Sequence, residues 1–275
     1  SNALICLIPH FNNPAGLTAS LASIGADEAC DVLVVDDGSV RLALDEAAAR
    51  AAFRARGEIH FLRLPENVGI EHALNAGLRW IDARGYEFVG RLDCGDENLP
   101  GRFARQQAWL EAHPEVVLLG GAASFVTREG QEAFVLRHPL AHGDILKALR
   151  NNSAFVHPAV VMRLAAAKEA GLYPLDVRAA EDYALFYSLA LRHPVANLPD
   201  VLIRYELDPG GISLSRRRQQ LHARLKVQWT HAGAAPAAWI GMLRTVLLLA
   251  VPYRLGFAVK RWLRRDLAPG DREAS

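Results

Sequence analysis

The 275-residue chain has few cysteines and almost no excess charge. Its three cysteines, Cys6, Cys30 and Cys94, are odd in number and form no C-x-x-C pair, which disfavours a disulfide framework and a zinc knuckle. This cysteine usage is typical of a reducing compartment, so we expect a cytoplasmic protein. The formal net charge of +1 argues against nucleic acid as a partner.

Signal sequences and phosphate-binding signatures are also missing. The apolar run at residues 4–8 is too short for a signal peptide and has no basic residues before it, and residues 1–3 read as a tag remnant. No G-x-G-x-x-G follows the first predicted strand, and no G-x-x-x-x-G-K-[ST] occurs, which disfavours dinucleotide-binding and P-loop enzymes. With 51% hydrophobic and 22% charged residues, the chain nevertheless has enough apolar side chains for a substantial core.

Short apolar runs alternate with amphipathic segments along the first part of the chain. The pattern predicts strands at 4–8, 31–37, 59–64 and 87–92 and helices at 16–24, 41–56 and 70–83. This alternation is typical of an α/β fold in which helices flank a mostly parallel sheet. Polar residues follow the first, second and fourth strands, and ligands of such sheets bind beyond the carboxyl ends of the strands.

Two acidic clusters stand at these strand ends. Asp36 and Asp37 end the second strand, and Asp93, Asp96 and Glu97 follow the fourth. Carboxylates at this edge can accept hydrogen bonds from a base or a ribose, or hold a divalent cation that neutralises a diphosphate. A single acidic turn is most often only a solvated turn, but two clusters at corresponding strand ends favour a ligand site.

Five motifs occur in the order found in family 2 glycosyltransferases, and the chain resembles that family over about residues 4–207. They are LIPHFNN (7–13), VVDDGS (34–39), NVGIEHALNAGL (67–78), RLDCGDENLPGRF (91–103) and AEDYALFYSLA (180–190). The resemblance implies a GT-A-like fold with a Rossmann-like nucleotide-binding half, and an inverting hexosyltransferase-type enzyme of bacterial surface-polysaccharide synthesis. Residues 4–212 would form the catalytic domain, with the nucleotide sugar bound by 4–113 and the acceptor by 114–212.

The resemblance also assigns roles to individual residues. It places the nucleotide sugar against Pro9, Phe11, Asn12, Asp36, Asp37, Asn67, Gly69, Arg91 and Asp93. Phe11 is expected to stack on the base, and either Asp36 or Asp37 to accept the base N–H. From its position beside Asp93, Arg91 is expected to form an ion pair with that acid.

The predicted metal motif departs from the family pattern. Family members often read D-A-D-D, whereas this chain reads Asp93-Cys94-Gly95-Asp96, so that a glycine replaces a usual metal contact. We expect Asp93 and Asp96 to hold Mg²⁺ or Mn²⁺, with Asp96 as the principal ligand because the permissive backbone of Gly95 lets it turn inward. The alternative is that metal binding is weak or absent.

The acceptor half carries two acids at the start of a predicted helix, residues 181–192. Acids in a first helical turn commonly complement the helix dipole, but the family match implies that one of them is the catalytic base. We expect Asp182 to deprotonate the acceptor hydroxyl and Glu181 to orient a hydroxyl or a cation. His157 is expected to line the acceptor pocket, or alternatively to make structural hydrogen bonds in a loop.

Beyond about residue 212 the sequence becomes apolar and basic, and residues 213–265 are predicted to form a helical extension. The uninterrupted apolar run at 246–251 is too short to span a bilayer. Residues 237–265 are therefore expected either to lie on an anionic membrane at the inner face of the cytoplasmic membrane, or to pack on the catalytic domain or on a second subunit.

The donor is expected to be a UDP- or dTDP-sugar and the acceptor a saccharide or a lipid-linked saccharide. Three other functions stay open. A sugar nucleotidyltransferase would share the acid-edged sheet, but no Gly-rich, Arg-bearing loop follows the first strand. A non-catalytic sugar-nucleotide-binding protein would suit Gly95, and a membrane-attached interaction protein would depend on the extension more than on the acids.

Overall fold

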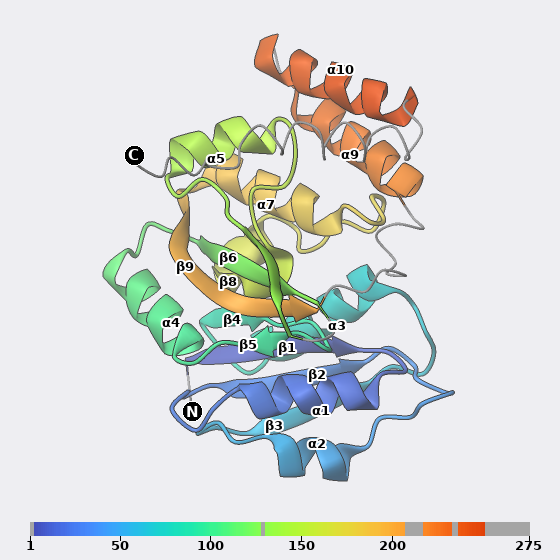
Figure 1. The fold of residues 1–275 in the computed structure, drawn as a ribbon, viewed down its shortest axis with the longest axis vertical. Helices are drawn as coiled ribbons and strands as arrows, with labels where there is room; N and C mark the ends of the chain where they lie inside the picture. The colour runs from blue at the N-terminus through green and yellow to red at the C-terminus, as the bar shows by residue number, and fades with distance from the viewer. Residues whose placement is uncertain (1–2, 128–129, 207–216, 233–235, 251–275) are drawn as a thin grey trace, which may run out of the picture.

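Four parallel strands form the first part of the sheet, as the sequence predicts. They are β1 (Leu4–His10), β2 (Asp31–Asp36), β3 (Ile59–Arg63) and β4 (Phe88–Arg91). The computed structural model of the chain describes residues 3–127, 130–206, 217–232 and 236–250. β2 pairs with β3 and β1, and β1 pairs with β4, all in parallel. The carboxyl ends of β1, β2 and β4 therefore lie side by side at one edge (Figure 1).

Helices cover both faces of the sheet. They are α1 (Pro14–Ser23), α2 (Glu46–Ala52), α3 (Ile70–Asp82), α4 (Arg102–Ala112), α5 (His142–Leu149), α6 (Leu164–Glu169), α7 (Glu181–Arg192), α9 (Arg217–His231) and α10 (Pro236–Ala250). Ile8 of β1 shares one core with Leu17 of α1, whereas Leu7 shares the other core with Leu74 of α3. Because consecutive strand residues point to opposite faces and both faces are covered, every residue of β1 and β2 is buried.

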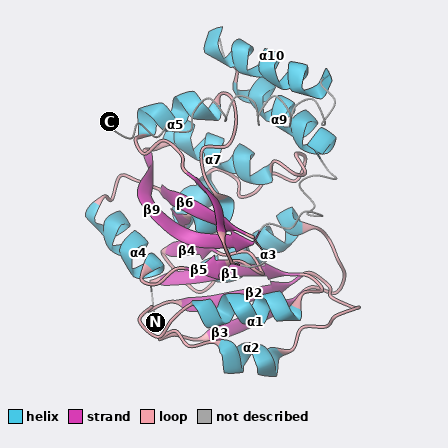
Figure 2. Cartoon of the chain, viewed as in Figure 1, coloured by secondary structure: helices cyan, strands magenta, loops and turns pink. Residues whose placement is uncertain are grey.

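The second part of the sheet is mixed. Its strands are β5 (Glu97–Asn98), β6 (Leu118–Val126), β7 (Glu132–Leu136), β8 (Val161–Arg163) and β9 (Val195–Glu206). β8 joins β4 antiparallel, with Val161 opposite Gly90, and β6 follows antiparallel to β8. The long, curved β9 then runs parallel to β6 and pairs with β5 (Figure 2). The α/β fold is confirmed, and antiparallel pairing begins where the predicted acceptor half (114–212) joins the sheet.

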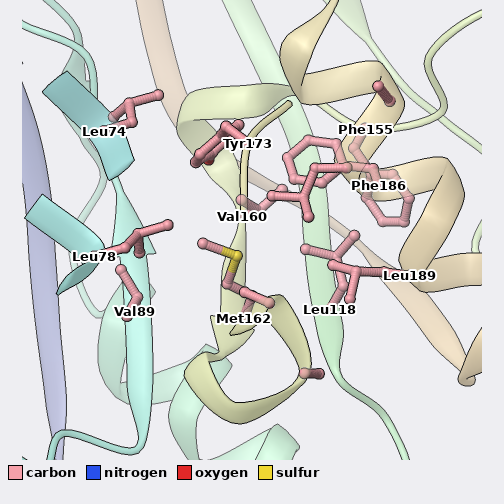
Figure 3. Close-up of a cluster of buried hydrophobic side chains, with 14 of the residues drawn as sticks. Leu74, Leu78, Val89, Leu118, Phe155, Val160, Met162, Tyr173, Phe186 and Leu189 are labelled. Carbon is pink, nitrogen blue, oxygen red and sulfur yellow. The ribbon is translucent and has the colours of Figure 1, made fainter. Parts of the chain in front are cut away.

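One apolar core joins the two parts of the sheet. Leu74 from α3 and Val89 from β4 face Met162 of β8, and Phe186 from α7 closes the other side (Figure 3). Tyr173, from the loop between α6 and α7, lies in this core and is 1% exposed. Burial of a large apolar side chain contributes about 1.5–3 kcal/mol, so this cluster holds α7 and its first residues in a fixed place on the sheet.

The helix predicted at residues 41–56 is shorter in the structure. α2 spans only Glu46–Ala52, because Asp45 caps it by accepting a hydrogen bond from the backbone N–H of Ala48 at 2.9 Å. The residues before it form a loop whose Arg41 and Leu42 N–H groups donate to Oδ1 of Asn12, each at 3.0 Å. The predicted ends of this helix were therefore wrong. Residues with high helix propensity do not show where a capping residue ends a helix or where a loop contacts a distant part of the chain.

Two helices of the C-terminal extension pack on the acceptor half. Gln228 of α9 is 2% exposed, donates to the carbonyl of Arg150 at 3.0 Å and accepts from the hydroxyl of Thr245 of α10 at 2.8 Å. α10 also approaches so closely that a Cβ at Gly241 would lie 2.2 Å from the carbonyl oxygen of Arg150. Residues 251–265 of the predicted extension lie outside the described part of the chain. Within the described part, no helix is both long and apolar enough to cross a membrane.

Candidate active site

Asp36 is held at the end of β2 by groups from two neighbouring loops. Its Oδ1 lies 3.0 Å from Nδ1 of His10 and accepts from the hydroxyl of Ser39 at 2.5 Å. Nε2 of His10 accepts from the backbone N–H of Asn13 at 3.3 Å, so the ring proton is on Nδ1 and is donated to Asp36. His10, which no motif assigns to the ligand site, is 1% exposed and joins the end of β1 to the end of β2.

Asp37 anchors the loop between β3 and α3. Its carboxylate accepts from Nδ2 of Asn67 at 2.9 Å, the N–H of Val68 at 2.9 Å and the N–H of Gly69 at 3.1 Å. Gly69 has φ of 99°, a conformation that favours glycine. The structure therefore brings together Asp37, Asn67 and Gly69, three of the predicted nucleotide-sugar residues, and it makes Asp37 the support of the other two.

Phe11 and Asn12 follow β1 and differ in their availability to a ligand. The side chain of Phe11 is 49% exposed, whereas that of Asn12 supports the loop before α2 through the two contacts given above. Pro9 is buried inside β1, opposite Val35 of β2. Of these three predicted residues, only Phe11 presents a free side chain at the carboxyl edge of the sheet.

A buried guanidinium organises the end of β4. Arg91 is fully buried, and its Nη1 donates to the carbonyl of Leu7 at 2.6 Å. Its Nη2 donates to Oδ1 of Asp93 at 2.6 Å, so the expected ion pair is present. Its Nε donates to Nε2 of His157 at 3.3 Å, and the hydroxyl of Tyr173 lies 2.8 Å from the same nitrogen. His157 thus makes hydrogen bonds of the structural kind, and its predicted contact with the acceptor stays a prediction.

The turn after β4 directs its two aspartates differently. The side chain of Asp93 is 39% exposed, whereas Asp96 is 5% exposed and its Oδ2 has no hydrogen-bond partner among the described residues. Gly95 between them has φ of 107°, and its N–H donates to the hydroxyl of Ser20 at 2.9 Å. Burial, and then the charge of Asp93, raises the pKa of Asp96 to about 8. Burial therefore favours the protonated form of Asp96 in the ligand-free protein.

The chemistry of these two acids is compatible with a divalent cation. A cation would give the orphaned Oδ2 of Asp96 a partner and would favour the ionised carboxylate. No group of three His, Cys, Asp or Glu side chains that could hold a metal ion occurs among the described residues, so these side chains alone do not form a complete cation site. Cys94 is a poor ligand, because burial raises its pKa to about 12 and its thiol donates to the carbonyl of Asn13 at 3.2 Å.

The first two residues of α7 carry the predicted catalytic acids. Glu181 is 8% exposed, and its Oε2 has no hydrogen-bond partner among the described residues. Burial, then the charge of Asp182, raises the pKa of Glu181 to about 7. Asp182 is only partly buried. Ala179, just before the helix, has φ of 68°, a strained value for a residue with a Cβ, so the chain enters α7 through a defined turn.

The charges of Asp93 and Asp182 both influence the pKa of His157. Burial, then Arg91, lowers the pKa of His157 to about 4, while the charges of Asp182 and Asp93 oppose this change. Asp93 is joined to His157 through Arg91, whereas Asp182, 89 positions later in the sequence, influences His157 through its charge. The pKa of His157 thus responds to the charges of both the predicted donor acid and the predicted base.

Sequence reasoning missed Tyr173 and Glu71. Glu71 lies in the first turn of α3, is 3% exposed, and its Oε1 lies 2.9 Å from Nε of Arg178. Neither residue stands next to an acidic motif, and both acquire their partners only through tertiary packing.

A cavity of about 550 Å³ lies at the amino ends of β2 and β3, away from the carboxyl edge of the sheet. It is lined by Asp31 and Tyr86, among others, and none of the predicted site residues lines it.

Proteins similar to this chain are glycosyltransferases. Residues 5–169 match the family described as glycosyl transferase family 2. The amylovoran biosynthesis glycosyltransferase AmsE of Erwinia amylovora is 36% identical over 207 residues, which cover 75% of this chain and 73% of that protein. The UDP-Gal:alpha-D-GlcNAc-diphosphoundecaprenol beta-1,3-galactosyltransferase of Escherichia coli is 28% identical over 196 residues, covering 70% and 69% of the two chains.

A solved structure has the same fold. The mannosyltransferase PcManGT of Pyrobaculum calidifontis, solved in complex with GDP-Man and Mn²⁺, matches this chain with a TM-score of 0.61. The match covers 98% of this chain and 76% of that one at 20% sequence identity. At this identity the likeness concerns the fold alone.

Proposed function

Because this chain belongs to glycosyl transferase family 2 and has a GT-A-type fold, we propose that it moves a sugar from a nucleotide-diphosphate donor to a saccharide or lipid-linked acceptor, with inversion at the anomeric carbon. One observation carries this proposal: Arg91 joins Asp93 of the donor half to His157, and the charge of Asp182 of the acceptor half raises the pKa of the same histidine. One site thereby has an acid for each substrate. The relative named for amylovoran biosynthesis supports a role in the synthesis of a surface polysaccharide.

On the donor side, the base lies at the ends of β1 and β2. Phe11 presents an exposed aromatic ring on which a base can stack. Asp36 or Asp37 accepts the base N–H, and the exposed oxygen of Asp93 accepts a ribose hydroxyl. Uracil and thymine each carry a ring N–H that a carboxylate can accept, so this contact suits the proposed UDP- or dTDP-sugar, although guanine carries such an N–H as well.

A divalent cation, Mg²⁺ or Mn²⁺, would be held by Asp93 and Asp96 together with the donor phosphates. The support is the orphaned Oδ2 of Asp96 and the Mn²⁺ in the similar mannosyltransferase. When bound, the cation would supply Lewis-acid stabilisation of the charge on the departing diphosphate. The protein residues would hold it weakly by themselves, because Gly95 offers no side-chain ligand.

On the acceptor side, Asp182 is the general base. It takes the proton of the acceptor hydroxyl as that oxygen attacks the anomeric carbon from the face opposite the diphosphate. Glu181, with a pKa of about 7, can donate or accept a hydrogen bond near neutral pH and so orient a sugar hydroxyl. The ionised form of Asp182 is the one that catalysis requires.

A turnover measurement distinguishes a glycosyltransferase from a sugar-nucleotide-binding protein and from a nucleotidyltransferase. Purified protein is incubated with UDP- and dTDP-hexoses and with lipid-linked saccharides, with and without Mg²⁺ or Mn²⁺, and release of the nucleoside diphosphate is measured. Acceptor-dependent release supports the transferase. Binding without release would indicate a sugar-nucleotide-binding protein, and release of pyrophosphate from a nucleoside triphosphate and a sugar phosphate would indicate a nucleotidyltransferase.

The outer face of α9 and α10 is apolar and lacks acids. Its exposed large apolar side chains are Trp229, Trp239, Ile240, Leu243, Val246 and Leu247. Neither helix contains Asp or Glu, whereas Arg218, Lys226 and Arg244 are among their cations. Because apolar and basic side chains together match an anionic lipid surface, we propose that this face attaches the enzyme to the cytoplasmic membrane, where a lipid-linked acceptor would be. If this face instead joins two copies of the protein in a homodimer, the membrane proposal is wrong.

A further inference from the structure

Three buried side chains connect the acceptor half of the protein to Asp93. The hydroxyl of Tyr173 lies 2.8 Å from Nε2 of His157, Nε of Arg91 lies 3.3 Å from the same nitrogen, and Nη2 of Arg91 lies 2.6 Å from Oδ1 of Asp93. Positions 91, 157 and 173 come from β4, η1 (His157–Ala159) and the loop before α7. The chain of hydrogen bonds is therefore a tertiary arrangement that no local motif contains.

The direction of these hydrogen bonds follows from the chemistry of arginine. A guanidinium N–H donates and cannot accept, so Nε2 of His157 must be the acceptor and the ring proton must be on Nδ1. The hydroxyl of Tyr173, at the shorter distance, then donates to the same nitrogen, so that Tyr173 and Arg91 share its single lone pair. The low pKa of His157, about 4, which burial and then Arg91 cause, agrees with a neutral ring at neutral pH. Because its Nε2 is occupied in this way, His157 is not placed to remove a proton from an acceptor through that nitrogen.

Tyr173 is itself fixed to α3. Its backbone N–H donates to Oδ1 of Asn75 at 2.9 Å, and Nδ2 of Asn75 donates to the carbonyl of Tyr173 at 2.8 Å. Asn75 is 3% exposed, and the ring of Tyr173 is packed near Leu74 and Val160 (Figure 3). The hydroxyl therefore has a fixed position relative to the helix that follows the Asn67–Gly69 loop.

We propose that Tyr173 and His157 are positioning residues, which hold the guanidinium of Arg91 so that Asp93 presents its free carboxylate oxygen to the donor. Arg91 also donates to the carbonyl of Leu7, so its plane is fixed at three points. The Asp93 side chain, 39% exposed, would otherwise be free to change rotamer. This inference rests on the proposed donor site, and it gives the acceptor half a direct part in donor binding.

The first test needs no ligand. In ¹⁵N NMR spectra of the full chain, with the His157 signals assigned by their absence from His157→Gln, the wild-type ring should be the Nδ1–H tautomer at pH 7. Tyr173→Phe should shift the Nε2 resonance. Tyr183→Phe is the matched control, because it also removes one buried tyrosine hydroxyl, which donates to the Leu149 carbonyl. An Nε2–H tautomer, or equal spectra for Tyr173→Phe and wild type, would overturn the hydrogen-bond chain.

The second test measures its effect on donor binding. The probe is whichever of UDP, dTDP and GDP, with Mg²⁺, raises the melting temperature of the wild-type protein most. His157→Leu removes the acceptor and should weaken binding of that nucleotide by on the order of tenfold, whereas His157→Gln, whose side-chain oxygen can accept near the Nε2 position, should restore most of the affinity. Equal affinity of His157→Leu and wild type would refute the positioning role, and so would equal losses in His157→Leu, His157→Gln and Tyr183→Phe.

The two tests separate this inference from the proposed function. If none of the three nucleotides binds the wild-type protein, the donor assignment fails. The tautomer of His157 then still decides whether the hydrogen-bond chain exists. If a nucleotide binds and His157→Leu leaves its affinity unchanged, the donor site stands and the positioning role fails.

Discussion

Arg91 and Asp93 are two residues apart at the end of β4 and form an ion pair of 2.6 Å in which the arginine side chain is fully buried and the aspartate side chain is 39% exposed. The buried member is also held by the carbonyl of Leu7 and by His157. Since the guanidinium cannot move, the exposed carboxylate is kept in one orientation. This relationship links the interior of the fold to the proposed donor site.

Replacement of Arg91 should therefore affect both stability and binding. Arg91→Met leaves the Leu7 carbonyl without its guanidinium donor and Asp93 without its ion-pair partner, and we expect a loss of about 3 kcal/mol in the free energy of unfolding. Arg105→Met is the matched control, because Arg105 pairs with Asp200 at 2.8 Å on the surface, and its loss should cost under about 1 kcal/mol. Urea unfolding measures both, and equal losses would contradict the role of Arg91.

The two buried acids predict how stability depends on pH. The pKa values of Asp96 and Glu181, about 8 and about 7, lie above the ordinary values of 3.8 and 4.5. Between these limits the folded protein binds protons that the unfolded chain releases, so the free energy of unfolding should fall as the pH rises from 5 to 8. Asp96→Asn should reduce this fall, whereas Asp27→Asn, at an exposed site, should not. Parallel melting curves for wild type and Asp96→Asn across this range would disprove the buried proton.

Gly95 should tolerate no side chain without strain, although there is space for one. A Cβ would meet only Nδ2 of Asn13 at 3.8 Å, but φ of 107° is unfavourable for any L side chain. We expect Gly95→Ala to lower the free energy of unfolding by about 1–3 kcal/mol. Gly143→Ala, in α5, has nothing within 4 Å of its Cβ and ordinary φ, and should be neutral or stabilising. A neutral Gly95→Ala would show that the turn is not constrained as described.

The membrane proposal predicts a site-specific loss of binding. A triple variant, Trp239→Ser, Leu243→Ser and Leu247→Ser, should float less with anionic vesicles than the wild-type protein, because about 25 cal/mol is lost for each Å² of apolar area no longer buried. The control is Leu140→Ser, Leu175→Ser and Leu191→Ser, three exposed apolar residues outside α9 and α10. If neither variant changes flotation and the first one changes the oligomeric state, this face is a subunit interface instead.

The parts of the fold that depend on local pattern could be predicted from the sequence. β1 and β2 are continuously apolar because both faces of the sheet are covered, and the Asp37, Asn67 and Gly69 positions were recognisable from motifs. The partners of His157 were not, because Arg91 lies 66 positions away and Tyr173 lies 16 positions away. The addition of β8 antiparallel to β4 was equally hidden, since register between distant strands depends on tertiary packing.

The inward direction of Asp96 was predicted, but its burial without a partner was not. Sequence spacing placed it beside Asp93 and near a flexible glycine. The burial depends on Ser20, 76 positions earlier, whose hydroxyl donates to the Asp96 carbonyl at 2.8 Å and so tightens the turn. Electrostatic properties such as the raised pKa of Asp96 depend on this burial and cannot be read from residue type.

The central claim is that Asp182 is the base of an inverting transfer, acting across the site from the donor acids. The most direct measurement compares turnover and nucleotide affinity in Asp182→Asn, with Asp176→Asn as control, since Asp176 is an exposed partner of Lys226. We predict that Asp182→Asn loses on the order of 10²–10⁴-fold in turnover while its nucleotide affinity stays near that of the wild-type protein, and that Asp176→Asn loses neither. Wild-type turnover by Asp182→Asn would contradict the account.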